Sequence, residues 1–339
     1  MTLKNLFSVL ILSFIFLRCS SDPLDVDASD VDLTINFRKV HSKLYHADSM
    51  ELIKVHSKYK KEITEIYNYY LGRCMEFPED MPDSSFAKQI IFLQSDPIMK
   101  DFEIAIEKKF HSLNSVEAKI VDGFKHLKYH LPRAKMPSDI IFINSRFQSN
   151  VFCTEKEISI GLERYLGGNS MVIQKYLDPR EFYNWIKEGM DARFLERDAL
   201  AGWISTHVVE NKEGNLAERM IFWGKVLYYT KAAFPEMEEH LIMRYKKSGW
   251  DWAVGNERDF WEYLVKEKAL FSSDELQIAN MIKEGPTTSG LPEKGGPDRM
   301  GQFIGYRMVR HYMKEKEIVV AKLAKVPYNS ILQEYKIED

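Results

Sequence analysis

Apolar residues recur at helical spacing along most of the chain. Between residues 48 and 72 they stand at Met50, Ile53, Tyr59, Ile63, Ile66 and Tyr70, a spacing that predicts an amphipathic helix. Asp96 followed by Pro97 is a strong start signal for another helix, because a capping residue precedes a proline at the first helical position. Periodicity and capping residues predict further helices at 86–93, 97–113, 115–131, 178–186, 192–209, 215–234, 248–266, 273–283, 301–313 and 330–335.

The hydrophobic pattern changes after Met136. Three short runs of branched and aromatic residues follow, at 139–144, 149–153 and 157–161, and such runs are typical of strands. Because they come in close succession, they predict a small antiparallel sheet at about residues 136–161. The whole pattern therefore indicates an α+β fold that is mainly helical, with helices before and after the sheet.

Residues 285–300 form a Gly/Pro-rich stretch inside the expected folded body. Loops of about 15 residues without secondary structure are uncommon and are often functional. We expect this loop to be an interaction surface; a plain solvent-exposed connection is the alternative. Its candidate contact residues are Gly285, Pro286, Gly290, Pro297 and Arg299. On the helix that follows, Gly301 and Gly305 share one face, which predicts close packing against another helix.

The N-terminus carries a different pattern. Lys4 is followed by an apolar run at residues 6–17, which as a helix would rise only about 18 Å and could not span a hydrocarbon core of about 30 Å. The run is typical of a secretory signal peptide, expected at 1–18. Cys19 follows directly, as in bacterial lipoprotein signals whose cysteine is acylated, although Arg18 stands where such signals favour a small residue. An uncleaved or differently cleaved signal is the alternative.

The residues after this signal are acidic and small. We expect residues 19–34 to comprise the lipidated Cys19 and a flexible tether that joins it to the folded body. The membrane is thus one expected partner, reached through the N-terminal lipid.

Composition narrows the class of protein. Apolar residues make up 45% of the 339 residues, enough for a sizeable core. The net charge is −3, whereas a nucleic-acid binder would show a basic excess or a basic stripe, so no nucleic-acid partner is expected. Beyond Cys19 the cysteines are Cys74 and Cys153. In an exported protein they can form a disulfide or stay as buried thiols, and both alternatives remain open.

Familiar catalytic signatures are absent from the sequence. It contains no G-x-S-x-G, no H-E-x-x-H and no Cys/His cluster at zinc spacing. It also lacks the phosphate-binding patterns G-x-G-x-x-G and G-K-[ST]. We therefore expect no catalytic residue, no metal and no cofactor.

Five segments, taken in order, carry a resemblance to a known family. They are ISIGLERYLG at 158–167, ERMIFWGKVLYY at 218–229, NERDFWEYLVKEKALFSSD at 256–274, EGPTTSG at 284–290 and DRMGQFIGYRMVRHYM at 298–313. Over about residues 35–338 the chain resembles the gliding-motility lipoprotein GldB family of Bacteroidota. The resemblance implies an exported lipoprotein of the cell envelope, at the outer membrane. It also implies a role in gliding motility and the associated protein secretion, through envelope proteins that the sequence does not name.

That family is distantly similar to zincin-type metallopeptidases, in which one helix carries H-E-x-x-H and the next supplies a glutamate ligand before a glycine. The resemblance places Trp203 and Ile204 at the first histidine and the general base, His207 at the second histidine and Trp223 at the glutamate. A catalytic zinc needs about three protein ligands, an open position for water and a base. One ligand position of three remains, so we expect a non-enzymatic protein whose peptidase-like site is filled with apolar side chains, among them Trp223 facing the preceding helix.

The resemblance also implies the domain organisation. A single domain is expected at 35–339, with a helical part at 35–132, a peptidase-like part at 136–315 and a C-terminal tail. The body is expected to be zincin-like.

Two other functions stay open. An envelope metallopeptidase could use an atypical zinc site built from His207, Glu210 and Glu218, although Glu218 is also expected to cap its helix. A carbohydrate-binding role would need Trp250 and Trp252 on the surface.

Overall fold

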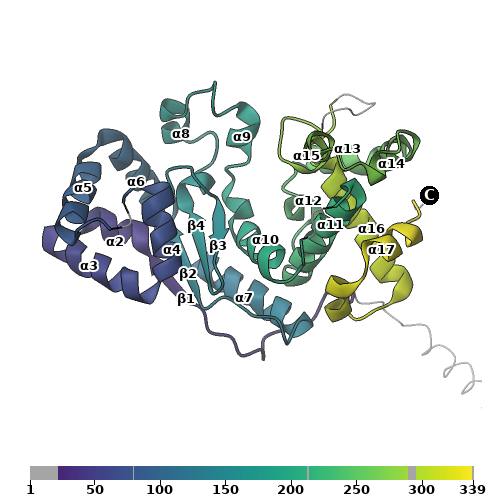
Figure 1. Cartoon of the computed structure of the whole chain (residues 1–339), viewed down its shortest axis with the longest axis horizontal. Coiled ribbons are helices and arrows are strands. Elements are labelled where there is room, and N and C mark those ends of the chain that lie inside the picture. Colours follow the sequence, from purple (N-terminus) through teal and green to yellow (C-terminus); the bar gives the residue numbers. More distant parts are fainter. Residues whose placement is uncertain (1–21, 79, 212–213, 289–294, 338–339) are drawn as a thin grey trace, which may run out of the picture.

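A four-stranded mixed sheet lies between two groups of helices (Figure 1). The structure is a computed structural model, and it describes residues 22–78, 80–211, 214–288 and 295–337. The strands are β1 (Asn36–Lys39), β2 (Asp139–Ile143), β3 (Val151–Cys153) and β4 (Glu157–Gly161), in the order β1-β2-β4-β3. The pairs β1–β2 and β2–β4 are parallel, and only β3–β4 is antiparallel. The predicted mainly helical α+β class is confirmed, but the prediction of an antiparallel sheet is wrong.

The burial of β2 explains the parallel pairing. Every residue of β2 is buried, which is the pattern of a strand covered by helices on both faces. Ile141 and Ile143 pack into the core of the N-terminal helices, and Ile140 and Phe142 pack into the larger core on the other face. The sequence prediction missed β1 because it is only four residues long and three of them are polar.

The helices before β2 pack on both faces of the sheet. They are α2 (Val40–His46), α3 (Ser49–Glu62), α4 (Thr64–Tyr69), the π-turn η1 (Tyr70–Cys74), α5 (Asp83–Ser95), α6 (Pro97–Lys109) and α7 (Asn114–His130). Among them, α2 to α5 pack with Ile141 and Ile143 on one face of the sheet, whereas α6 and α7 contribute to the core on the other face. The single helix expected at 48–72 is interrupted at Ile63, whose backbone leaves the helical region. Helix α6 begins as predicted, with the Asp96 carboxylate accepting hydrogen bonds from the amides of Ile98 and Met99.

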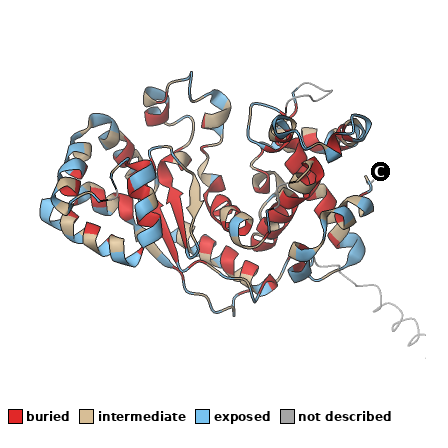
Figure 2. Cartoon of the chain, in the orientation of Figure 1, coloured by how far each residue is buried: buried red, intermediate tan, exposed pale blue. Residues whose placement is uncertain are grey.

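The chain after the sheet is helical. Its elements are η2 (Leu162–Tyr165), α8 (Met171–Tyr176), α9 (Asn184–Glu188), η3 (Ala192–Phe194), α10 (Leu195–His207), α11 (Leu216–Ala233), α12 (Glu239–Ile242), α13 (Lys247–Gly255), α14 (Glu257–Lys266), η4 (Ala269–Phe271), α15 (Glu275–Ile282), α16 (Met300–Lys316), η5 (Val320–Lys325) and α17 (Tyr328–Glu334). The helix predicted at 178–186 is wrong, because Asp178 starts a turn and only the short α9 follows. The helix predicted at 248–266 is divided at Asn256. Figure 2 shows the most continuous burial along β2, β4, α10, α11 and α16.

Helices α11 and α16 touch through their backbones. A Cβ added at Gly305 would overlap the carbonyl oxygen of Met220, and one at Gly224 would overlap the carbonyl oxygen of Gly305. A Cβ at Gly301 would lie 2.9 Å from the carbonyl oxygen of Met281 on α15. The close packing predicted for Gly301 and Gly305 is therefore confirmed, and Gly224 has the matching role on α11.

Part of the expected tether belongs to the folded body. Leu24 and Ala28 are buried, and the segment is held along α7, where Lys125 donates to the carbonyl of Ser29 and Lys128 to that of Asp32. Residues 22–34 of the expected tether therefore lie along the folded domain. The signal peptide and Cys19 lie outside the described residues, and within the described ones no helix is long and apolar enough to cross a bilayer.

Candidate functional site

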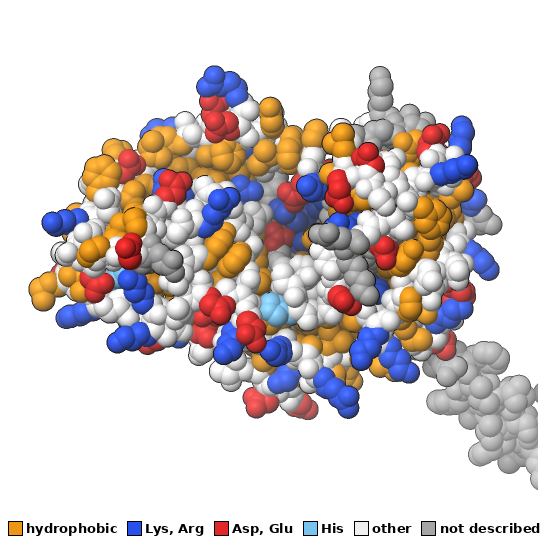
Figure 3. Space-filling view, in the orientation of Figure 1, with side chains coloured by type: hydrophobic (Ala, Val, Ile, Leu, Met, Phe, Trp, Pro, Cys, Tyr) orange, Lys and Arg blue, Asp and Glu red, His pale blue; other side chains and the backbone are white. Residues whose placement is uncertain are grey.

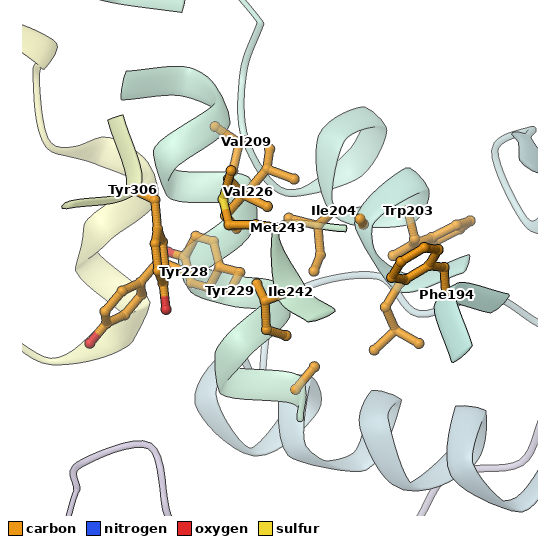
Figure 4. Close-up of a cluster of buried hydrophobic side chains, with 14 of the residues drawn as sticks. Phe194, Trp203, Ile204, Val209, Val226, Tyr228, Tyr229, Ile242, Met243 and Tyr306 are labelled. Atoms are coloured by element: carbon orange, nitrogen blue, oxygen red, sulfur yellow. The ribbon is translucent and has the colours of Figure 1, made fainter. Parts of the chain in front are cut away.

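The C-terminal half of α10 holds the positions that resemble a zinc site, and it is tightly packed. Trp203 has no exposed surface; its indole Nε1 donates to the carbonyl of Lys135 at 3.0 Å and its ring meets Phe124 edge-on. Ile204 is also fully buried. Figure 4 shows Ile204 in one apolar cluster with side chains of α11 and α12, while Trp203 lies nearer Phe194. Trp203 and Ile204 are thus both part of the apolar core.

His207 lies at the end of the same helix, against Trp203. The two rings stack with centroids 3.6 Å apart, and Nδ1 of His207 is 2.7 Å from the Thr206 hydroxyl. Burial lowers the pKa of His207, although backbone hydrogen bonding at Trp203 opposes that shift, so the neutral ring is favoured.

Glu210 and Glu218 were the other candidate ligands. Glu218 is engaged in the capping box of α11, where its side chain accepts from the Asn215 amide. Glu210 is exposed beyond the end of α10. Within the described part of the chain, no group of three or more His, Cys, Asp or Glu side chains is arranged to hold a metal ion.

Trp223 lies apart from Trp203. It is half-buried on α11 and meets Phe222 edge-on. It lines a cavity of about 440 Å³ together with Arg219 and Ile278. Arg197 of α10 lines the same cavity, so the expectation that Trp223 faces the preceding helix stays a prediction.

The two remaining cysteines are free thiols, so the disulfide alternative is wrong. Burial raises the pKa of both Cys74 and Cys153 to about 12, which keeps them protonated. Trp250 and Trp252 are half-buried. Trp250 packs edge-on against Phe303, which is not the open aromatic platform that a carbohydrate site would need.

The N-terminal end of α10 is charged instead of apolar. Arg197 and Asp198 are each 7% exposed. The Asp198 carboxylate accepts from the Tyr165 hydroxyl at 2.9 Å and from Arg197 Nη1 at 3.1 Å, and Arg244 Nε lies 3.5 Å from it. Arg197 Nε also donates to the carbonyl of Ile242 at 2.7 Å. These bonds satisfy a buried carboxylate that would otherwise be strongly unfavourable.

Arg244 extends this network toward the surface. Its Nη1 donates to Glu284 at 2.6 Å and its Nη2 to the carbonyl of Gly189 at 2.7 Å. Its guanidinium also lies over the ring of Phe194, 5.1 Å from the centroid. Arg244 therefore joins α10 to α9 and to the start of the Gly/Pro-rich loop.

Arg299 is buried, contrary to its expected place on an exposed contact loop. Its side chain is 8% exposed, it donates to both carboxylate oxygens of Asp298, and its guanidinium lies 5.4 Å from the centroid of Tyr245. Its backbone is left-handed, with φ 54°. The Tyr245 hydroxyl donates to the carbonyl of Asp298, and the amide of Gly285 donates to the Asp298 carboxylate at 3.1 Å. Arg299 thus helps to fix the two ends of the loop and is not itself an exposed contact residue.

The other candidate loop residues divide between surface and interior. Pro286 is exposed, whereas Pro297 is half-buried and its carbonyl accepts from Thr288. Gly290 lies outside the described residues. In the described part of the loop, the candidate contact residues at the surface are therefore Gly285 and Pro286, next to Glu284.

Neighbouring charges shift the pKa values of Glu284 and Arg164, which lie where this network reaches the cleft. Glu284 is half-exposed; burial raises the pKa of its carboxyl, but the charges of Arg244, Arg299, Arg164 and Arg197 outweigh that effect and lower it. The pKa of Arg164 is lowered, first by burial, with Glu163 and Glu284 opposing the shift.

Arg164 is positioned by its neighbour in sequence. Glu163 is fully buried and accepts from the amides of Ser145 and Phe147, each at 3.0 Å. These bonds fix η2, and Arg164 then donates to the Asn150 side chain at 2.5 Å.

The network forms one wall of a cleft of about 1360 Å³, which we call the arginine cleft. The space-filling view shows a hollow between the two halves of the molecule, with charged side chains of both signs at its bottom (Figure 3). Among the described residues, seven Lys and Arg line the cleft against four Asp and Glu. They are Lys109, Arg164, Lys187, Arg193, Arg244, Lys246 and Arg299 against Glu188, Asp191, Glu284 and Asp298. A cleft with a basic excess in a protein whose net charge is −3 is suited to anionic groups.

Sequence reasoning missed this cleft. Its charged residues come from α6, η2, α9, the segment around η3, the turn after α12 and the loop between α15 and α16. Several stand beside an oppositely charged residue in sequence, as in Arg164 with Glu163 and Arg299 with Asp298. Such adjacent pairs are also common on solvated faces, and they would not have distinguished this site.

Comparison with known proteins identifies a family. The family model described as "Gliding motility protein GldB" matches residues 21–337. No curated protein matches the chain, and no solved structure matches it. The expected likeness to zincins therefore stays a prediction.

Proposed function

The chain belongs to the GldB family of gliding motility proteins, and on that premise we propose that it is a membrane-anchored envelope lipoprotein that acts by binding other proteins, without catalysis. Its lipid is carried by Cys19 and its folded domain is exported, at the outer membrane. It supports gliding motility and the associated protein secretion through partners in the envelope. The family match over residues 21–337 carries the proposal.

The packing of α10 supports a binding role over catalysis. Trp203 and Ile204 fill two of the positions at which a zincin needs a ligand and a base, and both are fully buried. The neutral, stacked His207 is the one remaining ligand type there. An indole and an aliphatic side chain neither bind zinc nor move protons.

The anchor is tested by replacing the acylated residue. Cys19→Ser should release the protein from membranes into the soluble fraction, because a serine cannot carry the thioether-linked lipid; Ser20→Ala is the matched control and should stay membrane-bound. Fractionation followed by immunodetection is the measurement. Unchanged membrane association of the Cys19→Ser protein would rule out this anchor.

The absence of catalysis is tested at His207. Metal analysis of the purified protein should give no stoichiometric zinc, and cells carrying His207→Ala should glide at the wild-type speed, as should cells carrying the control His46→Ala at an exposed histidine. Stoichiometric zinc that is lost with His207 would instead establish the metallopeptidase alternative.

A further inference from the structure

We propose that the arginine cleft is the receptor site for an acidic polypeptide segment of a partner protein, whose carboxylates pair with Arg164 and its cationic neighbours. This inference rests on the proposed function, in which the protein acts by binding. It adds the place of binding and the chemistry of what is bound.

Unpaired cations supply the first argument. In the described part of the chain, Lys109, Arg164 and Lys187 line the cleft with no carboxylate within the 4.0 Å of an ion pair. In the described structure Arg164 donates to the neutral amide oxygen of Asn150, and the buried Lys187 to the carbonyl of Leu177. Glu163 and Glu284 act on Arg164 at longer range, without a direct ion pair. A guanidinium that is partly removed from water and has no direct ion pair gains most from a carboxylate, which it can hold through two parallel hydrogen bonds.

Pre-organisation supplies the second argument. Arg197, Asp198, Arg244 and Glu284 are already paired with one another, so this part of the wall is formed without a ligand, although the buried Nε of Arg244 has no hydrogen-bond partner in the described structure. The backbone beside Arg164 is fixed because the buried Glu163 accepts from the amides of Ser145 and Phe147. A cationic group that is fixed before binding loses little conformational entropy when an anion arrives.

The size and lining of the cleft point to a polypeptide. At about 1360 Å³ it exceeds the range of about 300–1,000 Å³ typical of small-molecule pockets, so a lone inorganic anion would leave it largely unfilled. Trp185 and Trp252 supply apolar surface beside the charges. Gly167 and Gly295 bring no side chain into the cleft, and no described atom lies within 4 Å of the place of a Cβ at either. A peptide chain offers carboxylates and apolar side chains together, which matches both the charged and the aromatic lining.

The test uses full-length protein purified from membranes and two defined pools of capped octapeptides. One pool carries two glutamates at random positions, and the other carries glutamine at those positions. Peptides retained by the immobilised protein are quantified by mass spectrometry. The glutamate pool should be retained and the glutamine pool washed away. Equal retention of the two pools would overturn the proposal.

Affinities of the best retained peptide locate the site. Arg164→Gln should weaken binding by about tenfold or more, Arg164→Lys should restore part of the loss, and the control Arg180→Gln, at an exposed arginine outside the cleft, should bind as wild type. Thermal unfolding confirms that each variant is folded. Equal affinity of Arg164→Gln and wild type would place the peptide elsewhere and sink the proposal.

Competition separates the polypeptide from other anions. Inorganic phosphate and an oligogalacturonate should displace the peptide only at concentrations well above its own dissociation constant. Displacement by either at lower concentrations would reassign the cleft to phosphate groups or to acidic saccharides. These peptide-binding measurements do not depend on the lipid anchor or on zinc. If peptide binding fails, the proposed function still stands. If the Cys19 or His207 tests fail, the peptide-binding results can still be interpreted.

Discussion

The two ends of α10 are buried by different kinds of interaction. At the C-terminal end, positions that resemble a metal site carry Trp203 and Ile204, and the surrounding core closes over them. At the N-terminal end, Arg197 and Asp198 are almost as deeply buried yet remain charged, because side chains from distant segments pair with them. Apolar burial needs only complementary shape, whereas charged burial needs every partner in place. The C-terminal end is therefore closed by apolar packing alone. The N-terminal end depends on charged side chains from distant segments and lies next to the network that borders the arginine cleft.

The largest expected effect comes from putting a charge at the closed end. Ile204→Glu should destabilise the protein by more than about 4 kcal/mol, because an unpaired carboxylate would enter a fully buried apolar position. Ile204→Val, the control that keeps the apolar character, should cost only about 1 kcal/mol. Urea unfolding followed by circular dichroism measures both. A stable Ile204→Glu protein would show that this end is an open site, and the contrast between the two ends would fail.

The next effect comes from removing a partner at the charged end. Arg244→Gln should cost about 1–3 kcal/mol, because Asp198 and the half-exposed Glu284 lose their shared cation while the buried Asp198 keeps Arg197 and Tyr165 as partners. Arg180→Gln removes an exposed ion pair with Asp178 and should leave the urea midpoint unchanged. Equal midpoints for Arg244→Gln and wild type would mean that the cluster contributes no net stability.

Acid should separate the two ends. The pKa of Glu284 is lowered from 4.5, so its contribution to stability is complete above about pH 4.5 and is lost as the pH falls through the folded-state value. Glu284→Gln should therefore be less stable than wild type at pH 7, and the difference should shrink below pH 4.5. Urea midpoints across pH 3–7 test this. A difference that stays constant over that range would exclude the ionised carboxylate as its source.

The smallest effect belongs to His207. Its pKa is lowered from 6.5, so the neutral ring stabilises the fold fully above about pH 6.5, and that stabilisation declines as the pH falls toward the folded-state value. In His207→Gln the decline between pH 6.5 and 5 should become smaller, because burial also lowers the pKa values of His56 and His130 and their share of the decline remains. The Glu284-dependent change at lower pH should also remain. A decline of the same size in His207→Gln would assign it to another histidine.

The closed end was accessible to sequence reasoning because its signal is local. A helix was predicted at 192–209, where α10 lies. The side chains of Trp203 and Ile204 neither bind zinc nor act as a base, and this can be seen from the residue types alone. The close approach of α11 and α16 was partly visible in Gly301 and Gly305, because glycines on one face of a helix leave a strip without side chains that a second helix can approach.

The sheet and the charged end were not accessible in the same way. A short run such as that of β1 has too few apolar residues to indicate a strand, and the pairing direction depends on helices that lie between strands in sequence. Arg299 looked like a surface residue because its partners, Asp298 apart, come from elsewhere in the chain. This charged cluster forms only when distant segments come together in the fold, so neither hydrophobic periodicity nor composition could predict it.

The burial of Leu24 has a mechanical consequence for a lipoprotein. With Cys19 as the proposed anchor, four residues, Ser20 to Pro23, separate the acylated residue from the buried Leu24. Five residue steps reach at most about 18 Å, so the domain would stay close to the bilayer. Asp22 and Leu24 line a cavity with Tyr228 and Arg310, and neither lines the arginine cleft. A short connection to the lipid would therefore attach the domain through a part that does not border the cleft, which leaves the cleft accessible to proteins in the aqueous compartment.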